Sequence, residues 1–298
     1  MTMQSARVMA TDSARQWKEE VERGDRFTFG ANWTSFLRVL DDDRVNAAVD
    51  SLKDMLEAER LDGKQFLDAG SGSGLFSLAA RRLGAKVVSF EFDAQCVACT
   101  DELKRRYFPD DPNWRVEQGS VLDQHFLSGL GTFDIVYSWG VLHHTGALWD
   151  ALQNVASLVA PNGRLFISIG NDQGRASRIW TRVKKAYVSA PKGLKWLVLT
   201  PALARLWGPT IVRDTLTGRP LRSWRAYDKK GRGMHPLRDV TDWVGGYPFE
   251  VAKPEEVLAF LRARGFELSR LKTCAGGHGC NEFVFVRSTD VERRRPAA

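Results

Sequence analysis

The chain has 298 residues, 43% of them hydrophobic, and a net charge of +7. This is enough apolar material for a packed core, and enough length for one large domain or a domain with a large insertion. No run of about 18 apolar residues occurs, so we expect no membrane span. Residues 1–26 are polar and charged and do not read as a signal peptide. Four cysteines in a chain of this size suit a reducing compartment, and we expect a cytoplasmic location.

The N-terminal part, residues 1–60, is predicted to form a helical cap. Within it, residues 41–56 place Val45, Ala48 and Leu52 on one face of an amphipathic helix. Its role depends on the segment that follows it.

The most informative stretch reads as a strand, a glycine-rich turn and a helix over residues 66–76. Its turn has the pattern D-x-G-x-G-x-G, formed by Asp68, Gly70, Gly72 and Gly74. A dinucleotide fingerprint has a different spacing, G-x-G-x-x-G. An acid before the turn repels a pyrophosphate and attracts an ammonium group. Glycines here let the backbone approach a ligand, and the following helix N-terminus adds free N–H donors.

A second acid lies at the end of the next predicted strand. Glu91 follows Gly70 by 21 residues, where nucleotide-binding α/β folds place the acid that holds ribose hydroxyls. In these residues the chain resembles the class I S-adenosylmethionine (SAM) dependent methyltransferases. A structural glycine turn in an unrelated α/β protein is the alternative.

The resemblance covers roughly residues 27–170 and 251–287, and it implies SAM as the cofactor. By resemblance, Phe29 and Trp33 close over the cofactor, although simple packing on the sheet edge is equally open. Ser120 stands where many relatives carry an acid that reads the adenine amine. The cofactor-binding residues that the resemblance implies are Asp68, Gly70, Ser71, Gly72, Gly74, Glu91, Phe92, Gly119, Ser120, Val121, Ser138 and Trp139.

Strand and helix patterns alternate through residue 170, which predicts a parallel sheet with crossover helices. The expected strands are 65–69, 86–92, 114–118, 133–138 and 164–169, with two more at 267–272 and 282–286. The expected helices of the alternating part are 75–83, 94–107, 148–159 and 254–264. We predict an α/β fold with a seven-stranded, mostly parallel, doubly wound sheet, the Rossmann-like methyltransferase fold. Its SAM-binding core is residues 61–170, completed by residues 251–298.

The fourth strand ends in Ser-Trp-Gly-Val at 138–141, followed by Leu-His-His. Enzymes that methylate base amines carry Asn/Asp-Pro-Pro-aromatic here, so the sequence argues against that class. Leu-His-His resembles the ubiquinone- and menaquinone-pathway enzymes and the natural-product O-methyltransferases. Histidine suits a general base near neutral pH. We predict His143 as the base, with His144 as the second candidate and Asp172 as a carboxylate partner.

Residues 171–250 form an insertion after the fifth strand, and we predict that it is a largely helical, acceptor-binding lid. Residues 173–247 contain 16 Lys and Arg against 4 Asp and Glu. Helices are expected at 178–188 and 195–207, and a loop at 231–246. Two readings compete, a lid over an anionic or amphiphilic small molecule and an interfacial helix near anionic lipid; a solvated basic face is the third. Polar residues that can line the acceptor pocket are His235, Asp239, Asp242 and Tyr247.

We therefore predict an enzyme that transfers a methyl group from SAM to a small-molecule acceptor, most simply to a hydroxyl. Carbon methylation of an isoprenoid or aromatic acceptor and RNA methylation through the basic insertion are alternatives, as is a SAM-binding regulator. We expect a small-molecule acceptor, peripheral contact with an anionic membrane surface, and no nucleic-acid partner; the oligomeric state is left open. Cys96 and Cys99, with Cys274 and Cys280, have spacing that can hold zinc. Buried thiols are the simpler interpretation, and we predict no metal.

Overall fold

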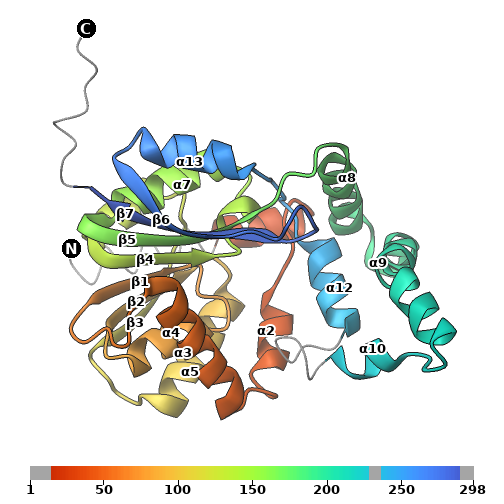
Figure 1. The fold of residues 1–298 in the computed structure, drawn as a ribbon, viewed down its shortest axis with the longest axis horizontal. Coiled ribbons are helices and arrows are strands. Elements are labelled where there is room, and N and C mark those ends of the chain that lie inside the picture. The colour runs from red at the N-terminus through yellow and green to blue at the C-terminus, as the bar shows by residue number, and fades with distance from the viewer. Residues whose placement is uncertain (1–14, 228–235, 289–298) are drawn as a thin grey trace, which may run out of the picture.

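A single seven-stranded sheet organises the protein, for which the computed structural model describes residues 15–227 and 236–288. The strand order is β3-β2-β1-β4-β5-β7-β6 (Figure 1). The strands are β1 (Gln65–Ala69), β2 (Lys86–Glu91), β3 (Trp114–Gln118), β4 (Phe133–Trp139), β5 (Val159–Gly170), β6 (Phe266–Lys272) and β7 (Cys280–Arg287). Only β7 runs antiparallel to its neighbours. The predicted seven-stranded, mostly parallel sheet is confirmed.

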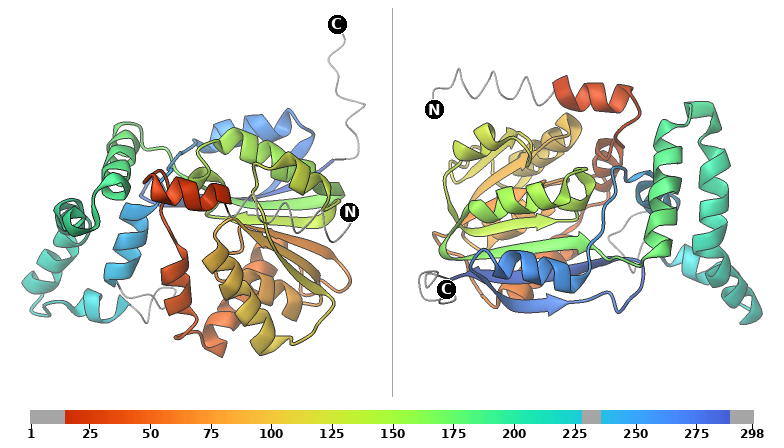
Figure 2. Two further views of the ribbon diagram at one scale, coloured as in Figure 1. Left: turned by 180° about the vertical axis from the view of Figure 1, so that it is seen from behind. Right: turned by 90° about the horizontal axis from the view of Figure 1, so that it is seen from above.

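Helices cover both faces of this sheet (Figures 1 and 2). One face carries α3 (Asp42–Leu56), α4 (Leu75–Arg82) and α5 (Ala94–Tyr107), and the other carries α7 (Leu148–Ser157) and α13 (Pro254–Arg262). Three short elements complete the chain order: α2 (Gly30–Phe36) precedes α3, α6 (Gln124–Ser128) lies between β3 and β4, and η1 (Leu142–His144) lies between β4 and α7. The layers follow from strand alternation: Ile135 and Tyr137 pack toward α3 and α4, whereas Val136 packs toward α7.

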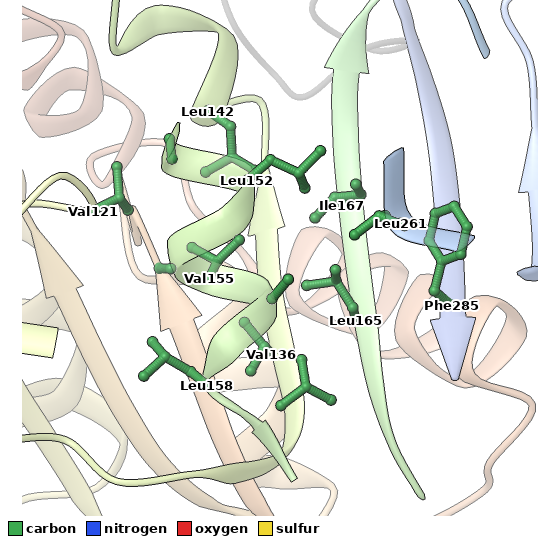
Figure 3. Packing of buried hydrophobic residues seen from close by; sticks show 14 of the residues in the cluster. Val121, Val136, Leu142, Leu152, Val155, Leu158, Leu165, Ile167, Leu261 and Phe285 are labelled. Carbon is green, nitrogen blue, oxygen red and sulfur yellow. The ribbon is translucent and has the colours of Figure 1, made fainter. Parts of the chain in front are cut away.

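The core beneath α7 and α13 shows how the sheet is sealed (Figure 3). Leu165 and Ile167 of β5 meet Leu152 of α7 and Leu261 of α13, and all four are fully buried. A parallel strand covered on both faces has to be apolar along its whole length. This requirement explains the apolar residues Leu165, Phe166, Ile167 and Ile169 at the end of β5, where Ser168 is the one polar exception.

The insertion after β5 is helical, and it builds a small core of its own. It consists of α8 (Arg175–Ser189), η2 (Lys192–Leu194), α9 (Trp196–Leu216), α10 (Arg222–Arg225) and α12 (Pro236–Gly245). Tyr187, Ala202, Val240 and Val244 are the buried residues at the centre of this second core. The insertion lies beyond the carboxyl ends of the parallel strands (Figure 2).

Three segments differ from the sequence prediction by five residues or more. The loop expected at 231–246 contains helix α12, with Pro236 at its first turn and Gly245 at its end; Pro and Gly there mark helix ends rather than a loop. Helix α9 extends past 207 to Leu216. Strand β5 starts at Val159, five residues early, because a register shift against β4 absorbs the expected turn at 161–163.

The cysteines occupy two separate parts of the fold. Cys96 and Cys99 are buried on α5, as expected, whereas Cys274 and Cys280 are half-buried near the β6–β7 hairpin. Helix α5 packs beside β2 and β3, at the opposite edge of the sheet from that hairpin. The two pairs therefore do not meet, and within residues 15–227 and 236–288 no cluster of His, Cys, Asp or Glu has the arrangement of a metal site.

Candidate functional site

One cavity of about 870 Å³ opens at the carboxyl ends of the parallel strands. Its wall combines the glycine turn after β1, the ends of β2 and β4, η1, and parts of α8 and α12. Most ligand sites in open α/β sheets lie at this edge. A volume near the upper end of the usual range for small-molecule sites leaves room for two ligands side by side.

The glycine turn lies against both the second and the fourth strand. The N–H groups of Gly70 and Ser71 donate to the Phe90 carbonyl, at 2.9 and 3.2 Å. A Cβ added at Gly70 would come within 2.5 Å of the Val141 side chain, and Gly70 also has a φ of +87°. Glycine is therefore required here, and it lets the turn approach the loop that carries the histidines.

Glu91 ends β2 with its carboxylate at the cavity wall. Its oxygens accept from the N–H groups of Gly72 at 3.1 Å, Phe92 at 2.7 Å and Asp93 at 3.3 Å. Burial raises the pKa of Glu91, while the Gly72 and Phe92 N–H groups oppose that shift. A carboxylate offers about four acceptor positions, so with three in use about one remains for a hydroxyl donor.

Asp68 lines the same cavity but has a second role. Its Oδ2 accepts from the Ser77 hydroxyl at 2.5 Å, and Ser77 also contacts Ser89 at 2.7 Å. Burial raises the pKa of Asp68 to about 7, Ser77 lowers it, and Glu91 raises it further. The expected attraction of an ammonium is thus weaker at neutral pH than for an exposed carboxylate, and Asp68 also anchors α4 to β1.

Five other predicted residues lie where a cofactor can reach them. Ser71, Phe92, Gly119, Ser120 and Val121 line the cavity. The Ser120 hydroxyl accepts from the Leu122 N–H at 3.1 Å, so its lone pair is partly used, although its proton is still available to a ligand. Gly119 has no room for a side chain, because an added Cβ would lie 2.3 Å from the Phe126 ring.

Two predicted cofactor residues, Ser138 and Gly74, lie outside the cavity wall. Ser138 is fully buried, and its hydroxyl donates to the Ala69 carbonyl at 2.8 Å, joining β4 to β1. Gly74 begins α4, and its Cα faces Thr100 of α5 so closely that an added Cβ would lie 2.9 Å from the Thr100 Cα. Both residues position the turn rather than a ligand. Trp139, the next residue after Ser138, does line the cavity.

The N-terminal segment covers the cavity from the other side. Phe29 and Trp33 both line it, and an added Cβ at Gly72 would lie 3.3 Å from the Trp33 ring. Arg26 donates to the carbonyls of His144 at 3.0 Å and Thr145 at 3.5 Å. Both aromatic side chains thus lie at the cavity wall, and their closure over a cofactor stays a prediction.

His143 is the more deeply buried of the two histidines, with 3% of its surface exposed. Its Nε2 lies 3.9 Å from the Cys280 Sγ, and its Nδ1 makes no hydrogen bond within the part of the chain that the structure describes. Burial lowers the pKa of His143 to about 3; Lys184 acts in the same direction, and the nearby Ser168 carbonyl opposes it. His143 is thus neutral at pH 7.

His144 is half-buried at the cavity wall, and its ring is oriented by a backbone group. Its Nδ1 lies 2.7 Å from the Pro248 carbonyl oxygen. Because a carbonyl can only accept, Nδ1 carries the proton and Nε2 keeps a free lone pair. Burial, then His143 and Lys184, lower the pKa of His144 well below its usual value.

The expected pairing of Asp172 with a histidine is wrong. The Asp172 carboxylate accepts from the Gly174 N–H at 2.7 Å, and the residue is not part of the cavity wall. Asp and Asn commonly bond to the backbone two residues on, and here this bond precedes the start of α8. The Pro248 carbonyl takes the orienting role that was expected of Asp172.

The insertion brings two carboxyl groups to the cavity. Asp242 accepts from the Asn32 side chain, and Tyr227 donates to Asp239. Burial raises the pKa of Asp242 to about 7, Asn32 opposes this, and Asp239 adds to it. Tyr247 instead packs on the core of the insertion, and His235 lies outside the described residues.

Lys184 is the residue whose place the sequence reading missed. The sequence counts it only among the basic residues of the insertion, yet only 1% of it is exposed, and it lines the cavity. A signal was present: Trp180, Lys184, Tyr187 and Val188 share one face of α8 at helical spacing. Phe249, which also lines the cavity, follows an irregular segment that gave no such signal.

The residues at the turn and at β2 fit SAM. The glycine turn leaves backbone exposed where a Cβ would clash, and Glu91 offers acceptors to a diol. Gly119 and Val121 provide a close, apolar surface for a flat base. These features are those of a nucleoside-binding edge.

A family model described as a methyltransferase domain matches residues 41–211, more than half of the chain. The chain belongs to this methyltransferase family. This confirms the predicted membership, and it agrees with SAM as the cofactor. The sheet order confirms the predicted fold. No helix within residues 15–227 and 236–288 combines the length and apolar character needed to cross a bilayer.

Methyltransferases of known activity are similar to parts of the chain. The ubiquinone biosynthesis O-methyltransferase, mitochondrial, of Schizosaccharomyces pombe is 34% identical over 110 residues, covering 36% of this chain and 38% of that protein. The ubiquinone biosynthesis O-methyltransferase of Rhizobium johnstonii is 25% identical over 195 residues, covering 65% and 73%. The magnesium protoporphyrin IX methyltransferase of Synechocystis PCC 6803, solved with bound SAH, matches with a TM-score of 0.47 at 18% identity, over 82% of each chain. The chain thus spans well under two thirds of the S. pombe protein's length.

The burial of His143 predicts a specific pH dependence of stability. Its pKa is about 3 in the fold, against about 6.5 in the unfolded chain, so below pH 6.5 only the unfolded chain takes up the proton. Lowering the pH from 7.5 to 5.5 should therefore reduce the free energy of unfolding by about 1.4 kcal/mol through this residue. Urea unfolding at the two pH values should show that the free energy of unfolding of wild type falls by that much more than the free energy of unfolding of His143→Gln. The exposed His125→Gln should follow wild type, and an equal loss in His143→Gln would contradict the burial argument.

Proposed function

We propose that the protein is a SAM-dependent methyltransferase that methylates a hydroxyl group of a small-molecule acceptor. The observation that carries the proposal is one cavity whose wall contains Glu91, the glycine turn and His144 together. When bound, SAM supplies an electrophilic methyl group on a sulfonium centre. In this proposal the chain keeps its expected division into a cap (1–60), a core (61–170 and 251–298) and a lid (171–250). A reducing compartment such as the cytoplasm suits the four cysteines, which form no disulfide among the described residues.

Holding and alignment are the first task of the chain's own residues. Glu91 would hold the ribose, the turn at Gly70 and Gly72 would lie along the amino-acid part, and Ser120 would face the adenine. Phe29 and Trp33 would exclude water from above. Placing two reactants in line can contribute most of the rate acceleration in a displacement reaction.

Proton removal is the second task, and the geometry moves this role from His143 to His144. The Nε2 of His144 is a free acceptor, because Nδ1 is held by Pro248. His143 is more deeply buried, and its Nε2 faces Cys280. His143 would then pack beneath η1 as a buried residue, while His144 accepts the hydroxyl proton.

Carbon methylation of an aromatic or isoprenoid acceptor is the second candidate function. It is favoured by one observation, the lowered pKa of both histidines, because weak bases suit an acceptor that needs little help with its proton. RNA methylation through the basic insertion is a third possibility, and its binding would weaken steeply with salt.

The helix α9 supports the proposed contact with an anionic membrane surface. At its start Trp196 is 60% exposed and Leu197 51%, and Lys192 and Lys195 come just before them in the chain. Apolar side chains next to lysines fit the interface of an anionic bilayer.

We expect the protein to sediment with vesicles of phosphatidylglycerol and phosphatidylcholine, and much less with phosphatidylcholine alone. The double variant Trp196→Glu/Leu197→Glu should lose most of this binding, because it removes apolar contact and adds repulsion. The matched control, Leu271→Glu on the edge strand β6, should keep it. Equal sedimentation of all three proteins, or none with anionic vesicles, would contradict the contact.

His144→Ala should lower kcat for a phenolic acceptor by about 10²-fold, near the lower end for general bases because its pKa is depressed. The assay uses methyl-labelled SAM with a panel of hydroxylated aromatic acids, and it measures label in the extracted product. Affinity for S-adenosylhomocysteine should change little, and the exposed His125→Ala should behave as wild type. The rate of wild type should not fall between pH 8 and 6.5 through this group, since His144 stays neutral there.

A His144→Ala enzyme with full kcat would exclude the proposed base and favour carbon methylation. A protein that binds neither SAM nor S-adenosylhomocysteine would contradict the proposed function itself.

A further inference from the structure

Lys184 occupies an unusual place on a basic helix. Its neighbours Arg182 and Lys185 are exposed, as expected for α8, whereas Lys184 is 1% exposed and ranks among the largest fully buried side chains. Burying an ammonium group is costly unless it is paired and hydrogen-bonded. Methionine or leucine would fill this position at lower cost.

The ammonium group is only partly satisfied. One donor of its Nζ goes to the Trp243 carbonyl, and the Nζ also lies 4.3 Å from the ring centroid of Trp243 and 4.5 Å from that of Phe249. Among the described residues, 15–227 and 236–288, no carboxylate forms an ion pair with Lys184. An ammonium has three donors, so two are left for the cavity that the residue lines.

The charged and titratable groups around Lys184 do not compensate its charge. His143 and His144 of η1 are neutral and both feel the positive charge of Lys184. Cys280 of β7 is the one group that raises the pKa of Lys184, against the larger effect of burial, which lowers it to about 7. The cavity therefore lacks an anion at this point.

The surroundings of the ammonium are aromatic. Trp180 and Trp243 pack edge to face with ring centroids 4.3 Å apart, and His278 lies 6.1 Å from Trp180 and 5.6 Å from Trp243. The Phe249 ring centroid lies 6.2 Å from that of His143 and 6.0 Å from that of His144. All of these rings line the cavity. Such walls favour a flat, aromatic ligand over a flexible polar one.

We propose that Lys184 binds the carboxylate of an aromatic carboxylic acid, which is the acceptor that this cavity takes. The two free donors of the ammonium match the two oxygens of a carboxylate, and the rings enclose the aromatic body. The inference rests on the proposed function, since it names the acceptor class for the same site. It also explains why a lysine, and not an apolar residue, is kept in this buried position.

A pair of matched probes tests the proposal, 4-hydroxybenzoate and its neutral analogue 4-hydroxybenzamide. Binding is measured by calorimetry and by quenching of tryptophan fluorescence, with S-adenosylhomocysteine present. Wild type should prefer the acid by at least about tenfold, as expected for a charge pair in a desolvated site. Lys184→Met should lose the preference, whereas Lys185→Met should keep it. Lys184→Gln is the second variant, in case the methionine variant does not fold.

Thermal unfolding gives an independent readout. If Lys184 is kept for binding, Lys184→Met should unfold at the same temperature as wild type or higher, because a buried unpaired charge is removed. A wild type that binds both probes equally, or neither, would overturn the proposal, as would a Lys184→Met variant that still prefers the acid. If S-adenosylhomocysteine binds normally in those cases, the methyltransferase function stands and only the acceptor class is wrong.

Discussion

The structure depends on one topological constraint, the pairing of β1 with β4. These strands are parallel neighbours in the sheet although β2 and β3 lie between them in the chain, so the segments that follow them leave toward opposite faces. A crevice has to open where they part. At the base of this crevice the Ser138 hydroxyl donates a hydrogen bond to the Ala69 carbonyl. The Val141 side chain packs against Gly70, in the space that a side chain there would occupy. The cofactor turn and the histidine loop are therefore placed relative to each other by the sheet itself.

Burial sets the protonation of the cavity in a consistent way. It raises the pKa of Asp68 and Asp242 to about 7, and it lowers the pKa of His143 to about 3 and that of Lys184 to about 7. Each shift favours the neutral form, as expected where water is largely excluded. Charged ligands can restore the ionised forms by pairing with them. The cavity is thus prepared for ligands that carry charges of their own. Residues of the insertion, which has a separate core, form part of its wall.

Much of the fold could be predicted because its signals are local. The glycine turn and the alternation of strands with helices follow from spacing within a few residues, and Glu91 is found by its place at the end of the next strand. The predictions that failed concerned contacts between segments that are distant in the sequence. Asp172 was expected beside the histidines because their strands are neighbours, but its own backbone offered a nearer partner in Gly174. The orienting group came from Pro248 instead, in a segment without periodicity. Lys184 was misread because a lysine in a basic segment suggests solvent, although its helical position among Trp180 and Tyr187 pointed inward.

The central claim is that Glu91 holds SAM at the carboxyl edge of the sheet, and calorimetric titration of SAM into Glu91→Gln tests it most directly. Glutamine keeps the shape of the side chain but removes the charge behind its hydrogen bonding to the ribose. The account predicts a loss of affinity of roughly 30- to 1,000-fold, about 2–4 kcal/mol, while the matched Glu117→Gln on β3, outside the cavity, binds as wild type. Unchanged affinity in a folded Glu91→Gln protein would contradict the account.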